Sequence, residues 1–443
     1  DGGRASTPDQ PHGRREKWSA RMCFRVAMFS LHTSPIAQLG RTRDAGGMNV
    51  YIRELSRELG RGGMYVDIFT RRSHPDTPRI QSIADRVRLI TITAGPSEPL
   101  PPSQLSPYVA EFSRRVARFA AEQDHPYDMV HSHYWLSAAA AAPLARLWDT
   151  PHVTMFHTVE RLKGQQQGLP LEATSAPKDG PAAIRIESEG HIATTADCVI
   201  VSTELEGEQL RRLYGLAPSH TRVIPCGVDL DAFTPATPER RIAARRALGL
   251  GETPTLLFVG RLDPIKGIDL LLESVAQLRT PARLLVVGGD PAGDPEVERL
   301  RARAAELGLA ERVRFPGAVP QRDLPTYYHA VDAVVVSSRY ESFGLVAVEA
   351  LACGAPVVAS AAGGLPSIVR DGENGLLVRW RCPQAFAEQI DLLLSDDALR
   401  EQMQASARQS IEQFDWRRIG DRVRDLYQEL TTESARVVAC SCF

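Results

Sequence analysis

Two glutamates, Glu341 and Glu349, interrupt the otherwise small and apolar segment ESFGLVAVEALACG. The apolar run AVVVSS precedes it, so we expect a strand, a loop and then a helix over LVAVEALAC that ends at Gly354. Backbone amides at the start of such a helix attract a diphosphate, and the carboxylates would hold sugar hydroxyls beside it. The alternative is that Glu341 caps the helix and Glu349 forms a salt bridge. The amides belong to Phe343, Gly344 and Leu345.

A pair of cations, Arg261 and Lys266, stands in the turn-forming segment GRLDPIKG, directly after the apolar run TLLFVG. Two cations at the carboxyl end of a strand can clamp a diphosphate and stabilise it as it leaves. The alternative is that both are solvated surface charges.

Two glycine pairs stand beside predicted strands and helices. Gly46 and Gly47 in DAGGMNVYIREL lie between the loop after the first predicted strand and a predicted helix, and Gly363 and Gly364 in AAGGLPS follow a predicted strand. Glycine lets the backbone approach a phosphate or a sugar closely, although the first pair does not form the dinucleotide fingerprint GxGxxG. An ordinary tight turn explains each pair equally well.

Three histidines, His131, His133 and His157, end predicted strands in HSHYW and FHT. No acidic residue or cysteine stands near them at ligand spacing, so we expect no metal there. A histidine that hydrogen-bonds a sugar, or for His131 a satisfied core histidine, is the interpretation that we favour.

Continuous apolar runs alternate with helical patterns along the chain, as in parallel sheets that are covered on both faces. The pattern predicts α/β doubly wound domains. The runs lie at 24–30, 65–71, 87–93, 128–133, 152–157, 198–203 and 222–226, and then at 255–260, 283–289, 312–317, 333–338, 356–360 and 375–378.

The chain of 443 residues exceeds what one hydrophobic core usually supports. The alternation pauses in turn residues and prolines at PCGVDLDAFTP and restarts after the charged helix ERRIAARRALGL. Two α/β domains would then face each other, with a ligand in the cleft beyond the strands' carboxyl ends. The predicted segments are a disordered leader over 1–21, domains over 22–235 and 236–414, and a final helix over 415–443.

Composition excludes several function classes. The net charge of −2 does not support general nucleic-acid binding, and no apolar run reaches the roughly 20 residues of a membrane span. The leader has no apolar core of a secretory signal. Seven scattered cysteines are typical of buried thiols in a reducing compartment, so we predict a cytoplasmic protein.

Taken in order, GGMNVY, HSHYW, FHT, PCGVDLDAF, FVGRLDPIKG, ESFGLVAVEALACG and GGLPSIVRDGENGLLV resemble the retaining glycosyltransferases of family GT4. The resemblance covers about residues 24–420. It implies the GT-B fold, in which two Rossmann-like domains face each other across a cleft. The N-terminal domain would bind the acceptor, the C-terminal domain would bind a nucleotide-sugar, and the last helix would cross back to the N-terminal domain. It implies no essential cofactor.

The resemblance also implies a role for individual residues. The catalytic residues would be His157, Arg261, Lys266 and Glu341. The donor would contact Gly46, Gly47, Phe343, Gly344, Leu345 and Glu349. The acceptor would contact Asn49, Tyr134, Thr158 and Arg185.

The acceptor pocket departs from the family pattern in one loop. Members with a phosphorylated acceptor carry a lysine after the sequence AGP, whereas Pro102 holds that place in AGPSEPLPPSQL. A phosphate would lose a charge-assisted contact of about 1.5–3 kcal/mol.

The resemblance as a whole predicts sugar transfer, with retention, from UDP-GlcNAc or UDP-glucose to a hydroxyl of a cyclitol, a sugar or its phosphate. An unphosphorylated aminocyclitol or sugar is the alternative acceptor.

Other classes stay open on the sequence alone. A nucleotide-sugar epimerase or a phosphorylase would use the same two-domain scaffold, and a nucleotide-sugar sensor would bind without turnover. The intact set of Arg261, Lys266, Glu341 and Glu349 argues against a sensor. A homodimer is compatible with the sequence.

Overall fold

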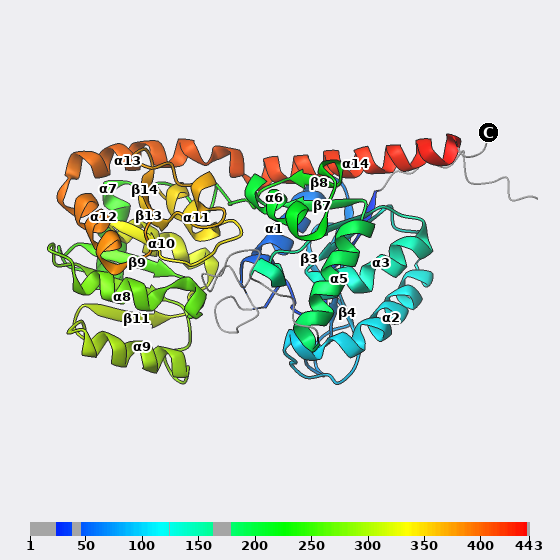
Figure 1. The fold of residues 1–443 in the computed structure, drawn as a ribbon, viewed down its shortest axis with the longest axis horizontal. Coiled ribbons are helices and arrows are strands. Elements are labelled where there is room, and N and C mark those ends of the chain that lie inside the picture. The colour runs from blue at the N-terminus through cyan, green and yellow to red at the C-terminus, as the bar shows by residue number, and fades with distance from the viewer. Residues whose placement is uncertain (1–23, 38–45, 124, 163–178, 441–443) are drawn as a thin grey trace, which may run out of the picture.

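The computed structural model describes residues 24–37, 46–123, 125–162 and 179–440 and forms two lobes side by side (Figure 1). The predicted leader over 1–21 lies outside the described residues. No helix in the described part is long and apolar enough to cross a bilayer.

The N-terminal lobe is built on one sheet in the order β3-β4-β2-β1-β5-β6-β7-β8. All neighbours pair in parallel except β3 with β4. The strands are β1 (Arg25–Phe29), β2 (Tyr65–Arg71), β3 (Ile80–Ala84), β4 (Val87–Ile92), β5 (Met129–His133), β6 (His152–Met155), β7 (Cys198–Val201) and β8 (Thr221–Val223).

Helices cover both faces of this sheet because successive strand residues point to opposite sides. Val26 and Met28 of β1 join the core under one face, whereas Ala27 and Phe29 join the core under the other. The helices are α1 (Gly47–Arg61), α2 (Val109–Ala121), α3 (Trp135–Trp148), α5 (Pro181–Thr195) and α6 (Glu204–Tyr214).

The C-terminal lobe repeats the plan with an all-parallel sheet in the order β11-β10-β9-β12-β13-β14. Its strands are β9 (Thr255–Val259), β10 (Arg283–Val287), β11 (Val313–Gly317), β12 (Ala333–Val336), β13 (Val357–Ser360) and β14 (Gly375–Val378). Its helices are α7 (Pro238–Ala247), α8 (Ile268–Ala276), α9 (Pro295–Glu306), α10 (Leu324–Ala330), α11 (Leu345–Ala352), α12 (Pro383–Ser395) and α13 (Asp397–Ser410).

Every apolar run expected to be a strand is one, and the sequence pattern missed only β3 among the described strands. This edge strand is largely exposed and antiparallel to β4, so it lacks the continuous apolar character of the others. The hairpin between them turns at Arg86, whose φ is +57°.

The chain crosses between the lobes twice, and the two crossings are bonded to each other. Val228 on the first crossing donates its backbone N–H to Phe414 O at 2.8 Å, and Trp416 on the second donates to Val228 O at 3.2 Å. Gly227 has no room for a side chain, since a Cβ would lie 2.4 Å from the Trp416 ring.

After the second crossing, α14 (Trp416–Cys440) runs back along the N-terminal lobe and packs on α1 (Figure 1). Tyr427 stacks on Phe24, and Trp416 meets Tyr51 of α1 edge-on at 5.5 Å between ring centroids. We retain 22–235, 236–414 and 415–443 as proposed domain limits.

Candidate active site

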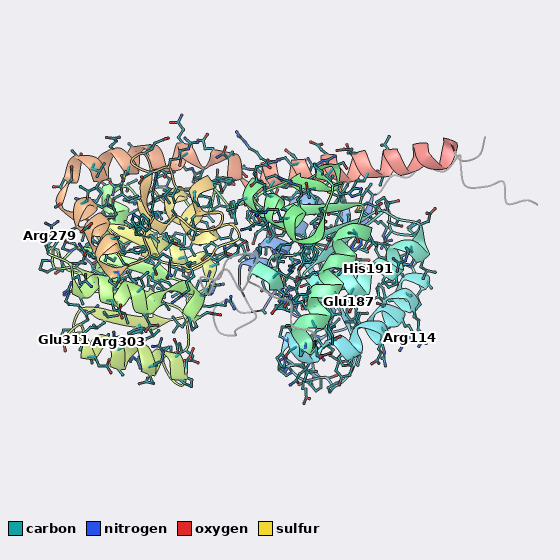
Figure 2. All side chains as sticks on the ribbon, in the orientation of Figure 1. Arg114, Glu187, His191, Arg279, Arg303 and Glu311 are labelled. Carbon is teal, nitrogen blue, oxygen red and sulfur yellow. The ribbon has the colours of Figure 1, made fainter. Side chains whose placement is uncertain are left out.

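A cavity of about 1040 Å³ lies between the lobes, and residues of both line it. Charged side chains such as Arg303 and Glu311 of the C-terminal lobe and Arg114 of the N-terminal lobe lie at the outer surface instead (Figure 2). All the site residues expected from the sequence line the cavity except Asn49. They are Gly46, Gly47, Tyr134, His157, Thr158, Arg185, Arg261, Lys266, Glu341, Phe343, Gly344, Leu345 and Glu349.

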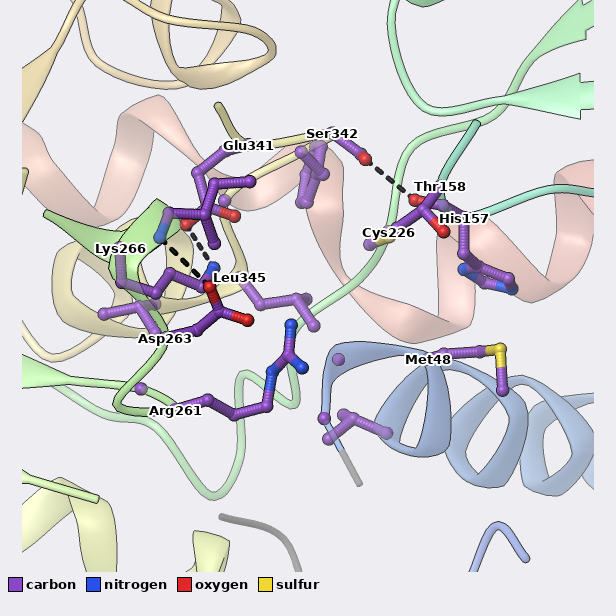
Figure 3. Close-up of a pocket in the computed structure, with 18 of the residues that line it drawn as sticks. Met48, His157, Thr158, Cys226, Arg261, Asp263, Lys266, Glu341, Ser342 and Leu345 are labelled. Atoms are coloured by element: carbon purple, nitrogen blue, oxygen red, sulfur yellow. Dashed lines mark hydrogen bonds and ion pairs between the residues drawn. The ribbon is translucent and has the colours of Figure 1, made fainter. Parts of the chain in front are cut away.

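Lys266 and Glu341 form an ion pair on the side of the cavity that the C-terminal lobe lines (Figure 3). Lys266 Nζ donates to Glu341 Oε1 at 2.6 Å, and Ser338 Oγ donates to the same oxygen at 2.7 Å. A short turn after β9 presents the lysine and ends at Gly267, whose φ is +70° and where a Cβ would lie 2.3 Å from Ser337 O. Both side chains of the pair keep part of their surface open to the cavity.

Arg261 extends from the end of β9 toward the start of α1 (Figure 3). A Cβ on Gly46 would lie 3.8 Å from Arg261 Nε, and a Cβ on Gly47 would lie 3.0 Å from Leu345 Cδ1. The first glycine pair therefore lies close to the C-terminal lobe, and a larger residue at Gly47 would press on Leu345.

The helix α11 begins at the cavity, and its N-cap residue Gly344 has φ +118°. A Cβ at Gly344 would lie 2.7 Å from Leu365, so the turn requires glycine. The Phe343 ring is buried against Phe414, which leaves only its backbone for a ligand. The helix ends one residue earlier than expected, with Cys353 as its C-cap and Gly354 following at φ +75°.

The second glycine pair closes on the loop that holds Glu341. Gly364 donates its N–H to Glu341 O at 2.7 Å, and a Cβ on Gly363 would lie 1.9 Å from that oxygen. The pair therefore supports the backbone of Glu341, a role that sequence reasoning did not consider.

Glu349 is 5% exposed and accepts hydrogen bonds from two neutral side chains. Gln321 Nε2 donates at 2.7 Å and Tyr328 OH at 2.8 Å. Burial raises the pKa of Glu349 to about 7. Gln321 also accepts from Arg53 of α1, so this chain of contacts joins the lobes beside the cavity.

His157 has φ +60°, and its carbonyl accepts the Ser342 hydroxyl of the opposite lobe at 2.8 Å (Figure 3). Its Nε2 lies 3.0 Å from His133 Nδ1, and His131 Nδ1 lies 2.6 Å from Tyr427 OH of α14. Burial lowers the pKa of His157 to about 3, so the ring is neutral. Among the described residues, no group of three or more His, Cys, Asp or Glu could hold a metal ion.

Three of the four expected acceptor residues meet at the N-terminal side of the cavity. Arg185 of α5 donates to Tyr134 OH at 3.0 Å and to Thr158 O at 2.7 Å and Oγ1 at 3.1 Å. Two carboxylates that sequence reasoning missed also bind it, Glu160 at 3.0 Å and Glu189 at 2.6 Å. The spacing of Arg185 and Glu189, one helical turn apart, is the one signal that could have predicted a partner.

Asn49 lies apart from this cluster. Its amide donates to Thr33 Oγ1 at 2.8 Å and to Ser34 O at 2.7 Å, and its carbonyl oxygen accepts the Gly46 N–H at 2.9 Å. Asn49 thus fixes the start of α1, and its expected contact with an acceptor stays a prediction.

Known families match both lobes. Residues 45–232 match Glycosyltransferase Family 4, and residues 241–410 match Glycosyl transferases group 1. The D-inositol 3-phosphate glycosyltransferase of Xylanimonas cellulosilytica is 41% identical over 413 residues, which cover 92% of this chain and 97% of that protein. The protein of the same name from Geodermatophilus obscurus is also 41% identical and aligns with 94% of this chain and 92% of its own length.

Solved structures share the fold. Sucrose-phosphate synthase from Thermosynechococcus elongatus superposes with a TM-score of 0.83 at 34% identity, over 93% of this chain and all (100%) of that one. HepE of Anabaena, solved with UDP and glucose, has a TM-score of 0.71 at 21% identity and covers 92% of this chain and 100% of its own. The predicted α/β architecture of two facing Rossmann-like lobes is confirmed, and the chain belongs to the family 4 glycosyltransferases, hexosyltransferases with the GT-B fold.

Proposed function

We propose that this enzyme transfers a hexosyl group from a UDP-sugar to a hydroxyl of a cyclitol, with retention at the anomeric carbon. The observation that carries the proposal is the open Lys266–Glu341 pair beside the start of α11, in a cavity that both lobes line. The relatives named D-inositol 3-phosphate glycosyltransferase support a cyclitol acceptor. UDP-GlcNAc and UDP-glucose are the proposed donors.

The diphosphate of the donor would lie between the amide end of α11 and the cations Arg261 and Lys266. Preorganised charges of this kind stabilise the negative charge that develops on a leaving diphosphate, and they supply the largest part of catalysis in such sites. Glu341 would then accept hydrogen bonds from the hydroxyls of the donor sugar. Glu349 would face the ribose once Gln321 moves.

In the reaction, the bond between the anomeric carbon and the β-phosphate oxygen breaks while the acceptor oxygen bonds to the same carbon from the same face. The acceptor's proton passes to the departing phosphate oxygen, and UDP is the second product. No side chain is needed as a covalent nucleophile. The neutral His157 would hydrogen-bond the transferred sugar without adding charge.

The direct test is incubation with UDP-, GDP- and ADP-sugars against a panel of cyclitols and sugars, with nucleotide release and product mass read together. We expect UDP release only when an acceptor is present, and a product heavier than the acceptor by one hexosyl unit with the donor's anomeric configuration by NMR. Conversion of UDP-GlcNAc without an acceptor would instead identify an epimerase, and binding of UDP-sugars without turnover would identify a sensor.

The homodimer and the cytoplasmic location remain predictions. Size-exclusion chromatography with light scattering checks the first, and fractionation of the source cells checks the second.

A further inference from the structure

The ring of His157, which lines the cavity, is bonded to a second histidine that lies deeper in the lobe (Figure 3). His133 is fully buried at the end of β5, where it lies opposite Met155 of the neighbouring strand β6. Nδ1 of His133 lies 3.0 Å from Nε2 of His157, and the ring centroids are 5.2 Å apart. Because Nε2 of His157 is engaged in this contact, Nδ1 is the nitrogen that remains for a ligand.

The position of one proton decides what this nitrogen offers. Both rings are neutral, because burial lowers the pKa of His157 to about 3 and that of His133 well below its ordinary value. A neutral imidazole has one N–H donor and one acceptor nitrogen. If His133 donates to His157, the proton of His157 is on Nδ1, which then donates to a ligand. If His157 donates instead, its Nδ1 can only accept.

A third histidine and a tyrosine of α14 indicate the direction of this hydrogen bond. His131 Nδ1 lies 2.6 Å from Tyr427 OH. Burial raises the pKa of Tyr427 well above its ordinary value, so the hydroxyl keeps its proton. Within the described part of the chain this is the one hydrogen bond of that hydroxyl, and a buried donor is satisfied only if it donates. Tyr427 therefore donates to Nδ1 of His131, which leaves the proton of His131 on Nε2.

The contact between His131 and His133 carries the same order one ring further. Their centroids lie 4.3 Å apart, and each ring keeps Nε2 buried without a hydrogen-bond partner among the described residues. A second N–H on Nε2 of His133 would place two unsatisfied donors in contacting rings, where the low dielectric makes their repulsion costly. A lone pair on that nitrogen is favourable beside the N–H of His131. The proton of His133 is then on Nδ1 and is donated to His157.

Tyr51 of α1 keeps the rings in this orientation. It is fully buried and meets the ring of His133 edge-on at 5.6 Å and that of His157 at 5.3 Å between centroids. Trp416 of α14 packs edge-on against the same tyrosine at 5.5 Å. Side chains locked by packing in this way hold a site group in one geometry.

We propose that His133 is a positioning residue of the transfer reaction: it donates through Nδ1 to His157 and so keeps a proton on Nδ1 of His157 for a hydroxyl of the transferred sugar. The inference rests on the proposed function, in which His157 hydrogen-bonds that sugar, and it assigns His157 the role of donor. Tyr427 and His131 extend the chain of contacts to α14. The helix that returns to the N-terminal lobe therefore supports the site as well as the fold.

The kinetic test compares His133→Leu with His133→Asn, using UDP-GlcNAc and inositol 3-phosphate. Leucine fills a similar volume but has no donor, whereas the amide of asparagine can donate from a place close to that of Nδ1. We expect kcat to fall about tenfold in His133→Leu, as the loss of one oriented hydrogen bond implies, with little change in KM for the donor. His133→Asn should restore most of the rate.

A matched control is His152→Leu. His152 is a buried histidine of the same sheet, but its Nε2 is bonded to Ser132 Oγ at 2.8 Å instead of to the other histidines. This variant should lose thermal stability as His133→Leu does, while kcat stays close to the wild-type value. A fall in kcat that matches the fall in His133→Leu would show that lost stability alone explains the kinetic effect and would overturn the proposal.

The spectroscopic test needs no turnover. ¹⁵N NMR of the full-length protein with labelled histidine distinguishes a protonated from a bare ring nitrogen, and loss of the signal in His157→Asn identifies His157. We expect the proton of His157 on Nδ1 in the wild type and a mixture of the two tautomers in His133→Leu. Tyr427→Phe should shift the signals of His131 and His133.

The outcomes separate this inference from the proposed function. A proton on Nε2 of His157 in the wild type, or an unchanged kcat in His133→Leu, overturns the positioning role and leaves the glycosyltransferase intact. Equal losses of kcat in the leucine and asparagine variants also overturn it, because they indicate packing rather than a donated proton. Absence of UDP release with every acceptor overturns the proposed function, while the NMR signal still decides the tautomer. If His133→Leu folds poorly, the wild-type spectrum and His133→Asn decide.

Discussion

The two ends of the cavity each hold a cation and a carboxylate 2.6 Å apart, yet they differ in what the pair can still do. The side chains of Lys266 and Glu341 are 21% and 17% exposed, whereas those of Arg185 and Glu189 are 6% and 0% exposed. Under the proposed function, the Lys266–Glu341 pair would exchange partners when the diphosphate of the donor binds. The acceptor-end pair is part of the fold. Whether an ion pair is available to a ligand therefore depends less on its residue types than on how deeply its side chains are buried and on how many of their N–H donors already bind the protein.

The variant Arg185→Ala tests the structural side of this comparison and should have the largest effect. It leaves two carboxylates without their cation, and breaking a buried ion pair costs about 3–5 kcal/mol. Urea denaturation should show a loss of that size in the free energy of unfolding. Arg279→Ala is the control, since its side chain is 84% exposed. A loss below 1 kcal/mol, which is about what a surface pair contributes, would contradict the comparison.

The variant Lys266→Ala tests the functional side. Removing one preorganised charge from a leaving-group site lowers kcat by about 10²–10³-fold. The fold should survive, because the lysine is partly open to the cavity, and thermal unfolding checks this directly. Arg322→Ala, on an 85% exposed side chain of the same lobe, should leave the rate unchanged. A near-normal rate in Lys266→Ala would remove the donor assignment.

Glu349 adds a third case to the comparison of the two ion pairs. Its carboxyl group lies near Lys266 and Glu341 in the C-terminal lobe, but it is buried and bonded only to neutral side chains. Its pKa of about 7 lies above the ordinary 4.5, so the folded protein keeps a proton that the unfolded chain releases. The free energy of unfolding should therefore fall as the pH rises from about 4.5 to about 7, by about 3 kcal/mol for this group.

Glu349→Gln should remove that contribution, measured by urea denaturation across the same pH range. Burial also raises the pKa of Glu206 to about 7, so part of the pH dependence should remain in the variant. A pH profile identical to that of the wild type would show that the pKa of Glu349 is the same in the folded and unfolded states, which would contradict the raised value.

The smallest effect should come from Ser342→Ala, which deletes the hydrogen bond to His157 O across the cavity. One neutral hydrogen bond contributes about 1 kcal/mol, so kcat/KM should fall about fivefold if lobe closure accompanies catalysis. Small-angle scattering should show a more open particle. Ser188→Ala, which affects only a bond within α5, serves as the control. An unchanged rate would show that this contact does not hold the lobes together.

The fold was largely predictable because continuous apolar runs and the single pause near residue 230 reflect how parallel sheets are buried. The meeting of Tyr134 and Thr158 follows from the same logic, since β5 and β6 are neighbours and both residues stand just beyond their carboxyl ends. The contact of Glu160 with Arg185 was not predictable, and neither was the fact that Arg185 already binds several protein partners. Both depend on how α5 packs over those strand ends. The contacts of Asn49 with Thr33, Ser34 and Gly46 at the start of α1 were not predictable either, because they depend on how the loop after β1 folds back on that helix.

The paired crossings at Val228 and Trp416 have a consequence for protein engineering. A chimaera that replaces the C-terminal lobe needs two fusion points rather than one, because the chain enters that lobe at the first crossing and returns to the N-terminal lobe at the second. A single fusion point near residue 235 would carry away the helix whose Trp416 and Tyr427 cover α1 and Phe24. Exchange of sugar specificity between relatives should therefore keep residues 415–440 with the half that they pack against.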